Sequence, residues 1–420
     1  MEALRIEGGV PLSGEIIVEG AKNAALPACI AALLTDEPVV LHRVPRLRDI
    51  STILFTLGAL GARVIRHDHH VSILGEGPLS TEADAYSVRQ MRASFLVLAP
   101  LLARLGRAVV PLPGGCAIGR RPIDLHLDGL RALGARVEES GSVVSVRSDQ
   151  LVGARIRLPY PSVGATEQIL MAATLAKGET IIENGAIEPE VEELACLLRK
   201  MGAEISLDDG AYKIVGQKRL RGAEHTLIPD RMEAGTFLLA AAISGGAITV
   251  RGARGNHLAP FLEPLEASGA GVAIADDAVT VEGPSRPLAV RIATAPHPGF
   301  PTDLHPPFVA YQALSNGTGS LTETVFEGRF AYTEALGRMG AQISRDGSVL
   351  TITGVDALEG QTVAATDIRA GAALVLAGLA AQGQTIVTHL EHLDRGYSCL
   401  DEKLRSLGAN IERRAELSRD

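Results

Sequence analysis

The chain has no tryptophan, and aromatic residues make up only 3% of its 420 positions. Proteins that stack bases or sugar rings on aromatic side chains need such residues in number. A bound base or sugar would therefore have to be held by polar and backbone groups. The net charge of −9 also argues against a general nucleic-acid binder, for which clustered Lys and Arg are typical. We expect no nucleic-acid partner, and we expect any anionic ligand to be held by a local group of cations.

Cysteine is scarce, and long apolar runs are absent. The four cysteines form no CxxC pair and no His/Cys spacing typical of zinc sites, which indicates a reducing cytoplasm and no metal. The longest apolar run, 93–105, contains Ser94, Pro100 and Arg104 and is too short to span a bilayer. The N-terminus carries Glu2 and soon reaches a Gly-Gly turn, unlike a signal peptide. We expect a cytoplasmic protein without a membrane partner.

Nucleotide-cofactor motifs are missing as well. Neither a Walker A sequence nor a GxGxxG in a strand context is present, which argues against an ATP or nicotinamide enzyme and for a reaction without cofactors. The remaining composition, 46% hydrophobic and 21% charged, is that of an ordinary soluble globular protein. A chain of this length predicts two or three domains.

What the chain does contain is an internal repeat. A Gly-Ala pair, followed one residue later by Val or Ile, closes a helical stretch six times, and its glycines, 61, 134, 202, 269, 340 and 408, lie 67–73 residues apart. This pattern predicts a helix that ends at a left-handed Gly with a strand directly after it. Upstream of each copy lies an Ala-rich helix that is apolar nearly all round and must be buried. A Gly turn and a β-branched strand, such as 179–182 or 247–250, are expected after each buried helix.

The repeat predicts an α/β (α+β) fold. Six βαβαββ units should form two domains of three units each, with the helices buried and the sheets outside. We expect the first domain over 20–228 and the second over 229–420. Residues 1–19 are predicted to be a strand pair that completes the second domain. Polar residues begin each buried helix, where N–H groups and the helix dipole attract anions, so we expect the active site in the cleft between the domains.

The stretch from Pro113 to His126 is too rich in Gly and Pro to continue a helix or strand, so it predicts a mobile surface loop. It places Cys116 near Arg120 and Arg121, and cationic neighbours favour a reactive thiolate. A lone loop cysteine is more often structural than catalytic, and the residues alone leave this open.

Over its whole length the chain resembles the enolpyruvyl transferases. Nine ordered motifs carry the resemblance: 20–27 (GAKNAALP), 91–94 (MRAS), the Cys116 loop, 162–167 (SVGATE), 229–231 (PDR), 300–303 (FPTD), 322–327 (TETVFE), 366–369 (TDIR) and 394–397 (DRGY). The family fold, two domains of three repeats with the site between them, agrees with the repeat pattern.

The resemblance implies transfer of the enolpyruvyl group of phosphoenolpyruvate to the 3′-hydroxyl of UDP-N-acetylglucosamine, with release of phosphate. The implied route is addition and then elimination, as the first committed step of peptidoglycan synthesis, and so of cell-wall biogenesis, cell shape and cell division. Two alternatives stay open: an enolpyruvyl transferase with another acceptor, and a non-catalytic paralogue that only binds the nucleotide sugar.

The resemblance also implies roles for individual residues. Cys116 matches the proton donor and fosfomycin target, and Asp303 matches the group that accepts the hydroxyl proton. Lys22, Arg121 and Arg395 match the phosphoenolpyruvate-binding cations, with Arg92 among them, and Lys22 and Arg395 are counted with the catalytic residues. The expected substrate contacts also include Asn23, Pro122, Ile123, Asp124, Leu125, Ser162, Val163, Gly164, Val325, Asp367 and Arg369.

Some of these positions have a purely structural alternative. Thr302-Asp303 could simply cap the helix that follows, with Pro306 and Pro307 in its first turn. Residues 162–164 could be a plain helix-starting turn. The chain also departs from the family pattern, since Tyr160, Ile187, His305 and Gly328 replace more usual side chains, which puts the tightness of substrate binding in doubt more than the reaction.

Overall fold

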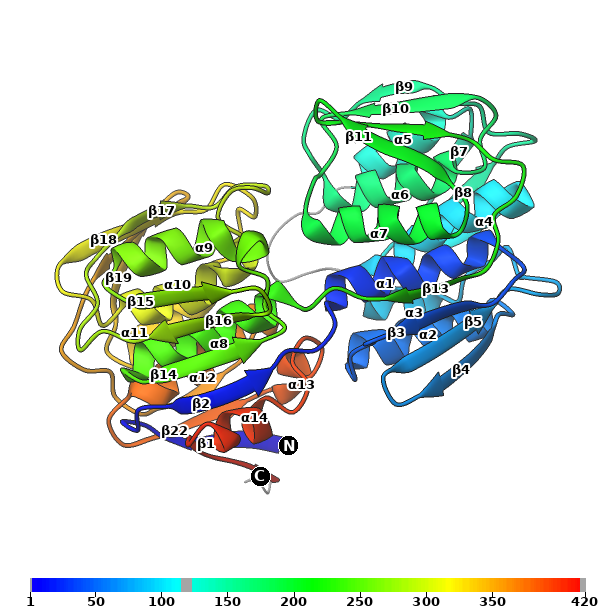
Figure 1. Ribbon diagram of the computed structural model, residues 1–420. Helices are drawn as coiled ribbons and strands as arrows, with labels where there is room; N and C mark the ends of the chain where they lie inside the picture. Colours follow the sequence, from blue (N-terminus) through cyan, green and yellow to red (C-terminus); the bar gives the residue numbers. More distant parts are fainter. Residues whose placement is uncertain (1, 115–122, 416–420) are drawn as a thin grey trace. The chain divides into compact units, whose positions relative to one another are not determined.

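The computed structural model describes residues 2–114 and 123–415 (Figure 1). These residues form two compact units, which we call the 20–228 unit (20–114 with 123–228) and the 229–415 unit (2–19 with 229–415). Each unit has its own hydrophobic core, one drawn from positions 21–228 and the other from 4–18 and 232–411. Each unit is therefore able to stabilise its own arrangement of helices and sheets.

The 20–228 unit contains seven α-helices among its described residues, with two short 3₁₀ segments. The helices are α1 (Lys22–Ala31), α2 (Arg48–Ala59), α3 (Ala85–Gln90), α4 (Leu98–Leu105), α5 (Asp124–Ala132), α6 (Val163–Ala173) and α7 (Pro189–Lys200), with η1 (Ala32–Leu34) and η2 (Arg92–Val97). The strands are β3 (Val39–His42), β4 (Arg63–His67), β5 (His70–Leu74), β6 (Arg107–Pro111), β7 (Arg136–Ser140), β8 (Val143–Arg147), β9 (Arg155–Arg157), β10 (Glu179–Glu183), β11 (Glu204–Asp208), β12 (Ala211–Val215) and β13 (Ala223–Thr226).

The 229–415 unit repeats this plan and recruits two strands from the start of the chain. Its helices are α8 (Arg231–Ser244), α9 (Gly255–Ala267), α10 (His305–Gln312), α11 (Tyr332–Arg338), α12 (Ile368–Ala380), α13 (Leu390–Leu393) and α14 (Leu400–Ser406), with η3 (Thr302–Leu304). Its strands are β1 (Glu2–Glu7), β2 (Ser13–Ile17), β14 (Ala247–Arg251), β15 (Gly271–Ala275), β16 (Ala278–Glu282), β17 (Arg291–Ala293), β18 (Thr318–Thr322), β19 (Gln342–Asp346), β20 (Val349–Thr353), β21 (Thr362–Ala364), β22 (Gln384–Thr388) and β23 (Asn410–Ala415).

Each repeat supplies one sheet, and five of the six sheets have the same order of strands. In the sheet β9-β10-β12-β11, β9 and β10 are parallel, and the other neighbours are antiparallel. The sheets built around β3, β14, β18 and β22 follow the same order. The second repeat differs, because its first strand is reduced to one bridge between Glu82 and Val109 beside the three-stranded sheet β6-β8-β7.

The N-terminal strands do not pair with each other, although the sequence predicted a strand pair. β1 lies between β22 and β23, whereas β2 pairs in parallel with β14 (Figure 1). β1 completes the sheet of the last repeat, and β2 completes the sheet of the fourth repeat. β13 does the same for the first repeat, since it pairs in parallel with β3.

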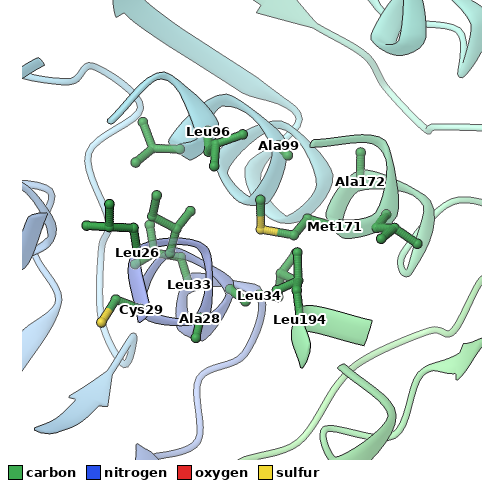
Figure 2. Close-up of a cluster of buried hydrophobic side chains, with 14 of the residues drawn as sticks. Leu26, Ala28, Cys29, Leu33, Leu34, Leu96, Ala99, Met171, Ala172 and Leu194 are labelled. Atoms are coloured by element: carbon green, nitrogen blue, oxygen red, sulfur yellow. The ribbon is translucent and has the colours of Figure 1, made fainter. Parts of the chain in front are cut away.

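The Ala-rich helices are buried, as their composition predicted. In the 229–415 unit, α8, α10 and α12 contact one another. In the 20–228 unit, η2 contacts both α1 and α6, and α4 packs on α6. Figure 2 shows Leu26 of α1, Leu33 of η1, Leu96 of η2 and Met171 of α6 in one apolar cluster. The buried helices thus form the centre of each core.

The helix-ending glycines adopt the predicted conformation. All six have φ between +91° and +100°, the left-handed region that favours Gly. The Gly turn predicted after every buried helix has one exception. Residues 35–38, which connect η1 to β3, contain no glycine and no residue with positive φ.

Candidate active site

The starts of the buried helices carry polar side chains, as predicted. Ser162, Asp230 and Asp367 are N-caps whose side-chain oxygens accept backbone N–H groups of α6, α8 and α12. Lys22 is the first residue of α1, and Arg92 is the first residue of η2. The repeat therefore brings a polar side chain to the same structural position in both units.

Lys22 is held by a buried ion pair. Its ammonium group donates to Oδ2 of Asp49 at 3.2 Å, and the two side chains are 9% and 5% exposed. Asp49 belongs to the first turn of α2, so α2 fixes the direction in which the Lys22 side chain leaves α1. Asn23, the next residue of α1, is exposed. Asn23 is thus accessible to a ligand, while the Lys22 ammonium is fixed in place.

The segments 123–126 and 162–164 lie next to each other. His126 of α5 is buried, and its Nδ1 pairs with Oε1 of Gln168 on α6 at 3.2 Å. A Cβ at Gly164 would lie 2.8 Å from Cε1 of His126, so this close approach needs a glycine. The predicted nucleotide-sugar contacts Asp124 and Ser162 therefore begin two helices that pack on each other.

Ser162 also caps α6. Its hydroxyl oxygen accepts from the backbone N–H of Ala165 at 3.4 Å, so the structural alternative for residues 162–164 holds for this side chain. Ile123 and Leu125 are partly buried against the core of the unit, and Val163 is too. Cys116, Arg121 and Pro122 lie outside the described residues, so their predicted roles stay predictions.

In the 229–415 unit, Asp303 is the centre of a charged cluster. Arg329 donates from Nη1 to Oδ1 at 2.8 Å, and Arg369 donates from Nε and Nη2 to Oδ2 at 3.1 and 2.9 Å. The arginine side chains are 4% and 5% exposed, whereas the Asp303 side chain is 24% exposed. The carboxylate is therefore the accessible member of the cluster.

The alternative in which Asp303 caps the following helix is wrong. Neither η3 nor α10 has a side-chain cap, and the prolines at 306 and 307 occupy the first turn of α10. Since Pro has no N–H, that turn needs fewer acceptors, and the Asp303 carboxylate can turn to the two arginines instead.

Arg369 links Asp303 to the segment that contains Arg395. Nη1 of Arg369 donates to the Tyr397 hydroxyl at 2.9 Å, and that hydroxyl also pairs with Thr236 at 2.8 Å. Burial acts to lower the pKa of Arg369, but Tyr397 and Asp303 outweigh it and raise the pKa, so the guanidinium keeps its charge. Arg395, two residues before Tyr397, is half-buried.

Asp367 and Val325 both make local backbone hydrogen bonds. Asp367 caps α12 by accepting the N–H groups of Arg369 and Ala370 at 2.8 and 3.0 Å. Its role in the structure is thus to set the start of α12, from which Arg369 reaches Asp303. The backbone N–H of Val325 donates to Glu323 at 2.7 Å, which holds the turn after β18.

Sequence reasoning missed several residues of these clusters. Arg329 and Asp49 had no role, and their ionic partners lie 26 and 27 positions away in the sequence. A polar residue on the buried face of an amphipathic helix was the one available signal for Asp49. Glu323 and Tyr397 stood inside quoted motifs without a role of their own.

The described residues contain neither a metal-binding cluster nor a membrane-spanning helix. Within 2–114 and 123–415, no group of three or more His, Cys, Asp or Glu is placed to hold a metal ion. No helix in those two ranges combines the length and hydropathy needed to cross a membrane.

Comparison with known proteins assigns the family. The model of the family described as EPSP synthase (3-phosphoshikimate 1-carboxyvinyltransferase) matches residues 6–404. The chain is 46% identical over 418 residues to the UDP-N-acetylglucosamine 1-carboxyvinyltransferase of Finegoldia magna, across 98% of this chain and 99% of that protein.

Solved structures agree with this assignment. The enolpyruvyl transferase NikO from Streptomyces tendae matches with a TM-score of 0.89 at 25% identity, over 98% of each chain. EPSP synthase from Acinetobacter baumannii matches with a TM-score of 0.78 at 20% identity, over 99% of this chain and 100% of that one, a likeness of fold alone. The chain belongs to the EPSP synthase family of enolpyruvyl transferases.

Proposed function

We propose that this protein transfers the enolpyruvyl group of phosphoenolpyruvate to the 3′-hydroxyl of UDP-N-acetylglucosamine and releases phosphate. The observation that carries this proposal is the 46% identity, over 98% of the chain, to the Finegoldia magna protein that is named for this activity. The reaction would be the first committed step of peptidoglycan synthesis in the cytoplasm, and thus serve cell shape and cell division. It needs no cofactor.

The Asp303 cluster supports a role for this carboxylate as the proton acceptor. Arg329 donates once to Oδ1 of Asp303, and Arg369 donates twice to Oδ2. Because the arginines are buried and Asp303 is partly exposed, a substrate can reach the carboxylate without displacing them. The pair of guanidiniums also keeps the carboxylate in one orientation, which is what a positioned base requires.

We assign the other chemical steps to residues that the family resemblance identifies. Cys116 gives a proton to C3 of phosphoenolpyruvate while the sugar hydroxyl, deprotonated by Asp303, adds to C2. The resulting tetrahedral phospho-ketal then loses phosphate, and a proton leaves C3 to restore the double bond. Lys22, Arg92, Arg121 and Arg395 bind the phosphate and carboxylate groups, for which Arg provides paired donors.

We assign the nucleotide sugar to three groups of residues. Asn23 is exposed at the start of α1, and residues 121–125 and 162–164 include the starts of α5 and α6, which pack on each other. Val325 stands in the turn after β18, and Asp367 with Arg369 begins α12. Each unit would be a three-repeat inside-out barrel with its helices buried and its sheets outside.

The test is phosphate release from the purified protein with both substrates present. We expect release to require phosphoenolpyruvate and UDP-N-acetylglucosamine together, and to fall about 10²–10⁴-fold in Cys116→Ser, the loss typical of a missing acid or base. The matched control is Cys196→Ser, a cysteine of α7 outside the proposed site, which should keep wild-type turnover.

Two outcomes would contradict the proposal. Release that requires 3-phosphoshikimate in place of the nucleotide sugar would establish another acceptor. Tight binding of UDP-N-acetylglucosamine without any turnover would establish a non-catalytic paralogue. Wild-type turnover in Cys116→Ser would leave the reaction in place and remove Cys116 as the proton donor.

A further inference from the structure

Glu323, directly after β18, has a fully buried side chain that accepts five hydrogen bonds. Its Oε1 accepts from the Thr294 hydroxyl at 2.8 Å, from the N–H of Val325 at 2.7 Å and from the N–H of Phe326 at 3.0 Å. Two successive backbone N–H groups on one oxygen fix the turn that carries Val325. No part of the proposed chemistry uses Glu323 itself.

The other oxygen of Glu323 leads to Asp303. Its Oε2 accepts from the Thr302 hydroxyl at 2.8 Å. That hydroxyl in turn accepts from Nη1 of Arg329 at 3.0 Å, and the same Nη1 donates to Asp303 at 2.8 Å. Thr302 and Asp303 are neighbours in η3, so Glu323 fixes Asp303 through both its backbone and its arginine.

His305 and Tyr332 hold Glu323 from its buried side. Nδ1 of His305 pairs with Oε2 of Glu323 at 2.8 Å, and its Nε2 pairs with the Tyr332 hydroxyl at 2.7 Å. Burial lowers the pKa of His305 against the hydrogen bond and charge of Glu323, and burial raises the pKa of Tyr332, so the phenol keeps its proton. One assignment then satisfies every group: Tyr332 donates to Nε2, and Nδ1–H donates to Glu323.

Glu323 stays ionised in this setting. Burial alone would raise its pKa, but the hydrogen bond and charge of His305, together with the N–H groups of Phe326 and Val325, outweigh burial and hold the pKa below its usual range. A purely structural role would not need this charge, since neutral or apolar groups of similar volume are often at least as stabilising in a core. What the charge adds is a single fixed geometry for every donor that points at it.

We propose that Glu323 is a positioning residue of the transfer reaction, which holds the Val325 turn and the Asp303–Arg329 pair in one arrangement. Its two oxygens serve two different parts of the site, the predicted contact to the nucleotide sugar and the predicted base. His305 and Tyr332 set its orientation. This inference rests on the proposed function, and all of its groups belong to the 229–415 unit.

The first variant is Glu323→Gln, which keeps the volume and removes the charge. An amide can still accept from Val325 and Phe326, but its NH₂ group faces two donors, so the contacts of Thr302 and His305 must rearrange. We expect kcat to fall at least about tenfold, the effect of one hydrogen bond to a charged group, and KM for UDP-N-acetylglucosamine to rise severalfold. KM for phosphoenolpyruvate should stay near wild type.

A matched pair of variants separates positioning from stability. Tyr332→Phe removes the buried hydroxyl that supports His305, whereas Tyr311→Phe removes a buried hydroxyl of α10 that pairs with Ser268 at 2.8 Å. Both should lower the melting temperature to a similar extent. We expect kcat to fall about threefold in Tyr332→Phe and to stay at the wild-type value in Tyr311→Phe.

Equal kinetics in Tyr332→Phe and Tyr311→Phe, together with a kcat of Glu323→Gln within twofold of wild type, would overturn the inference. If the wild-type protein releases no phosphate, the proposed function fails, and calorimetric binding of UDP-N-acetylglucosamine decides the inference instead. Weaker binding in Glu323→Gln than in Tyr311→Phe would then support the positioning of the Val325 turn, and equal binding would overturn it. A wild-type protein that neither turns over nor binds the nucleotide sugar overturns both proposals.

Discussion

The two units share one repeat but hold their candidate site residues in different ways. In the 229–415 unit, Asp303, Arg329, Arg369 and Tyr397 are joined by a continuous series of ion pairs and hydrogen bonds. In the 20–228 unit, the carboxylate of Asp49 on α2 holds Lys22, and the neutral amide of Gln168 on α6 holds His126. A network that links several side chains holds them in one arrangement, and a contact between two helices fixes the direction of one side chain.

The difference teaches that the repeat determines where a polar side chain stands but not what it does. Asp230 and Asp367 occupy the starts of buried helices as caps, and Asp303, at the corresponding place, binds two arginines instead. The same position in the first repeat holds Lys22, a cation. The function of each position must therefore be tested against a residue that shares its structural role.

The largest effect is expected at Asp303, because its carboxylate is the centre of the charged cluster in the 229–415 unit. Asp303→Asn removes the charge and leaves Arg329 and Arg369 buried without it. We expect kcat for phosphate release to fall about 10²–10⁴-fold, as for loss of a positioned base, and the melting temperature to fall as well.

The control for Asp303→Asn is Asp84→Asn. Asp84 caps α3 by accepting from the N–H of Ser87 at 2.8 Å, and Asn is an equally good cap, so turnover and melting temperature should stay at wild type. If Asp303→Asn kept a kcat within tenfold of wild type, its assignment as the base would be wrong, and the cluster would only bind substrate.

The next effect concerns the ion pair of Lys22 and Asp49 in the 20–228 unit. Asp49→Ala leaves the Lys22 ammonium buried without this carboxylate, which typically destabilises a protein by about 3–5 kcal/mol. Urea unfolding should show this loss as a lower midpoint. Glu15→Ala is the control, because its pair with Arg251 is half exposed and should leave the midpoint unchanged. A midpoint for Asp49→Ala equal to that of the control would show that Lys22 does not depend on Asp49.

Much of the fold could be predicted because its signals are local. The Gly-Ala helix ends require a left-handed glycine, and a helix such as α12 without a polar face must be buried. The placement of β1, β2 and β13 could not be predicted in detail. Each pairs with a strand from a distant part of the chain, and a short strand sequence does not specify which sheet it joins.

The site, like the fold, has local features that the sequence predicts and long-range contacts that it does not. The helix starts could be located from the repeat, but their partners could not, because an ion pair such as Asp303 with Arg369 joins residues 66 positions apart. Whether a polar residue caps a helix or binds a neighbour depends on that partner. The capping alternative for Asp303 was therefore consistent with the sequence, and the contacts of Arg329 and Arg369 with its carboxylate exclude it. The repeat predicts Arg369 at a helix start but not its partner, and it does not predict Arg329.

The smallest expected effect is on the pH dependence of stability, and it compares one buried histidine from each unit. His126 of the 20–228 unit is buried beside the neutral Gln168, whereas His305 of the other unit pairs with a carboxylate. Burial lowers the pKa of His126 from 6.5 to about 4 against the opposing hydrogen bond from Gln168, while Arg92 lowers the pKa and Asp124 raises it by smaller amounts. Below pH 6.5 the unfolded chain therefore takes up a proton that the folded chain does not, so acid favours unfolding.

The expected loss from His126 is about 3 kcal/mol between pH 6.5 and pH 4, at about 1.4 kcal/mol for each pH unit. His126→Asn keeps a donor for Gln168 and cannot be protonated, so its free energy of unfolding should fall less steeply as the pH is lowered. Urea unfolding at pH 7.5, 6.0 and 5.0 measures both slopes. Parallel curves for wild type and His126→Asn would mean that the folded protein accepts a proton at His126. The α5–α6 contact would then tolerate a charge, and the contrast between the neutral partner of His126 and the carboxylate partner of His305 would not determine which histidine is protonated.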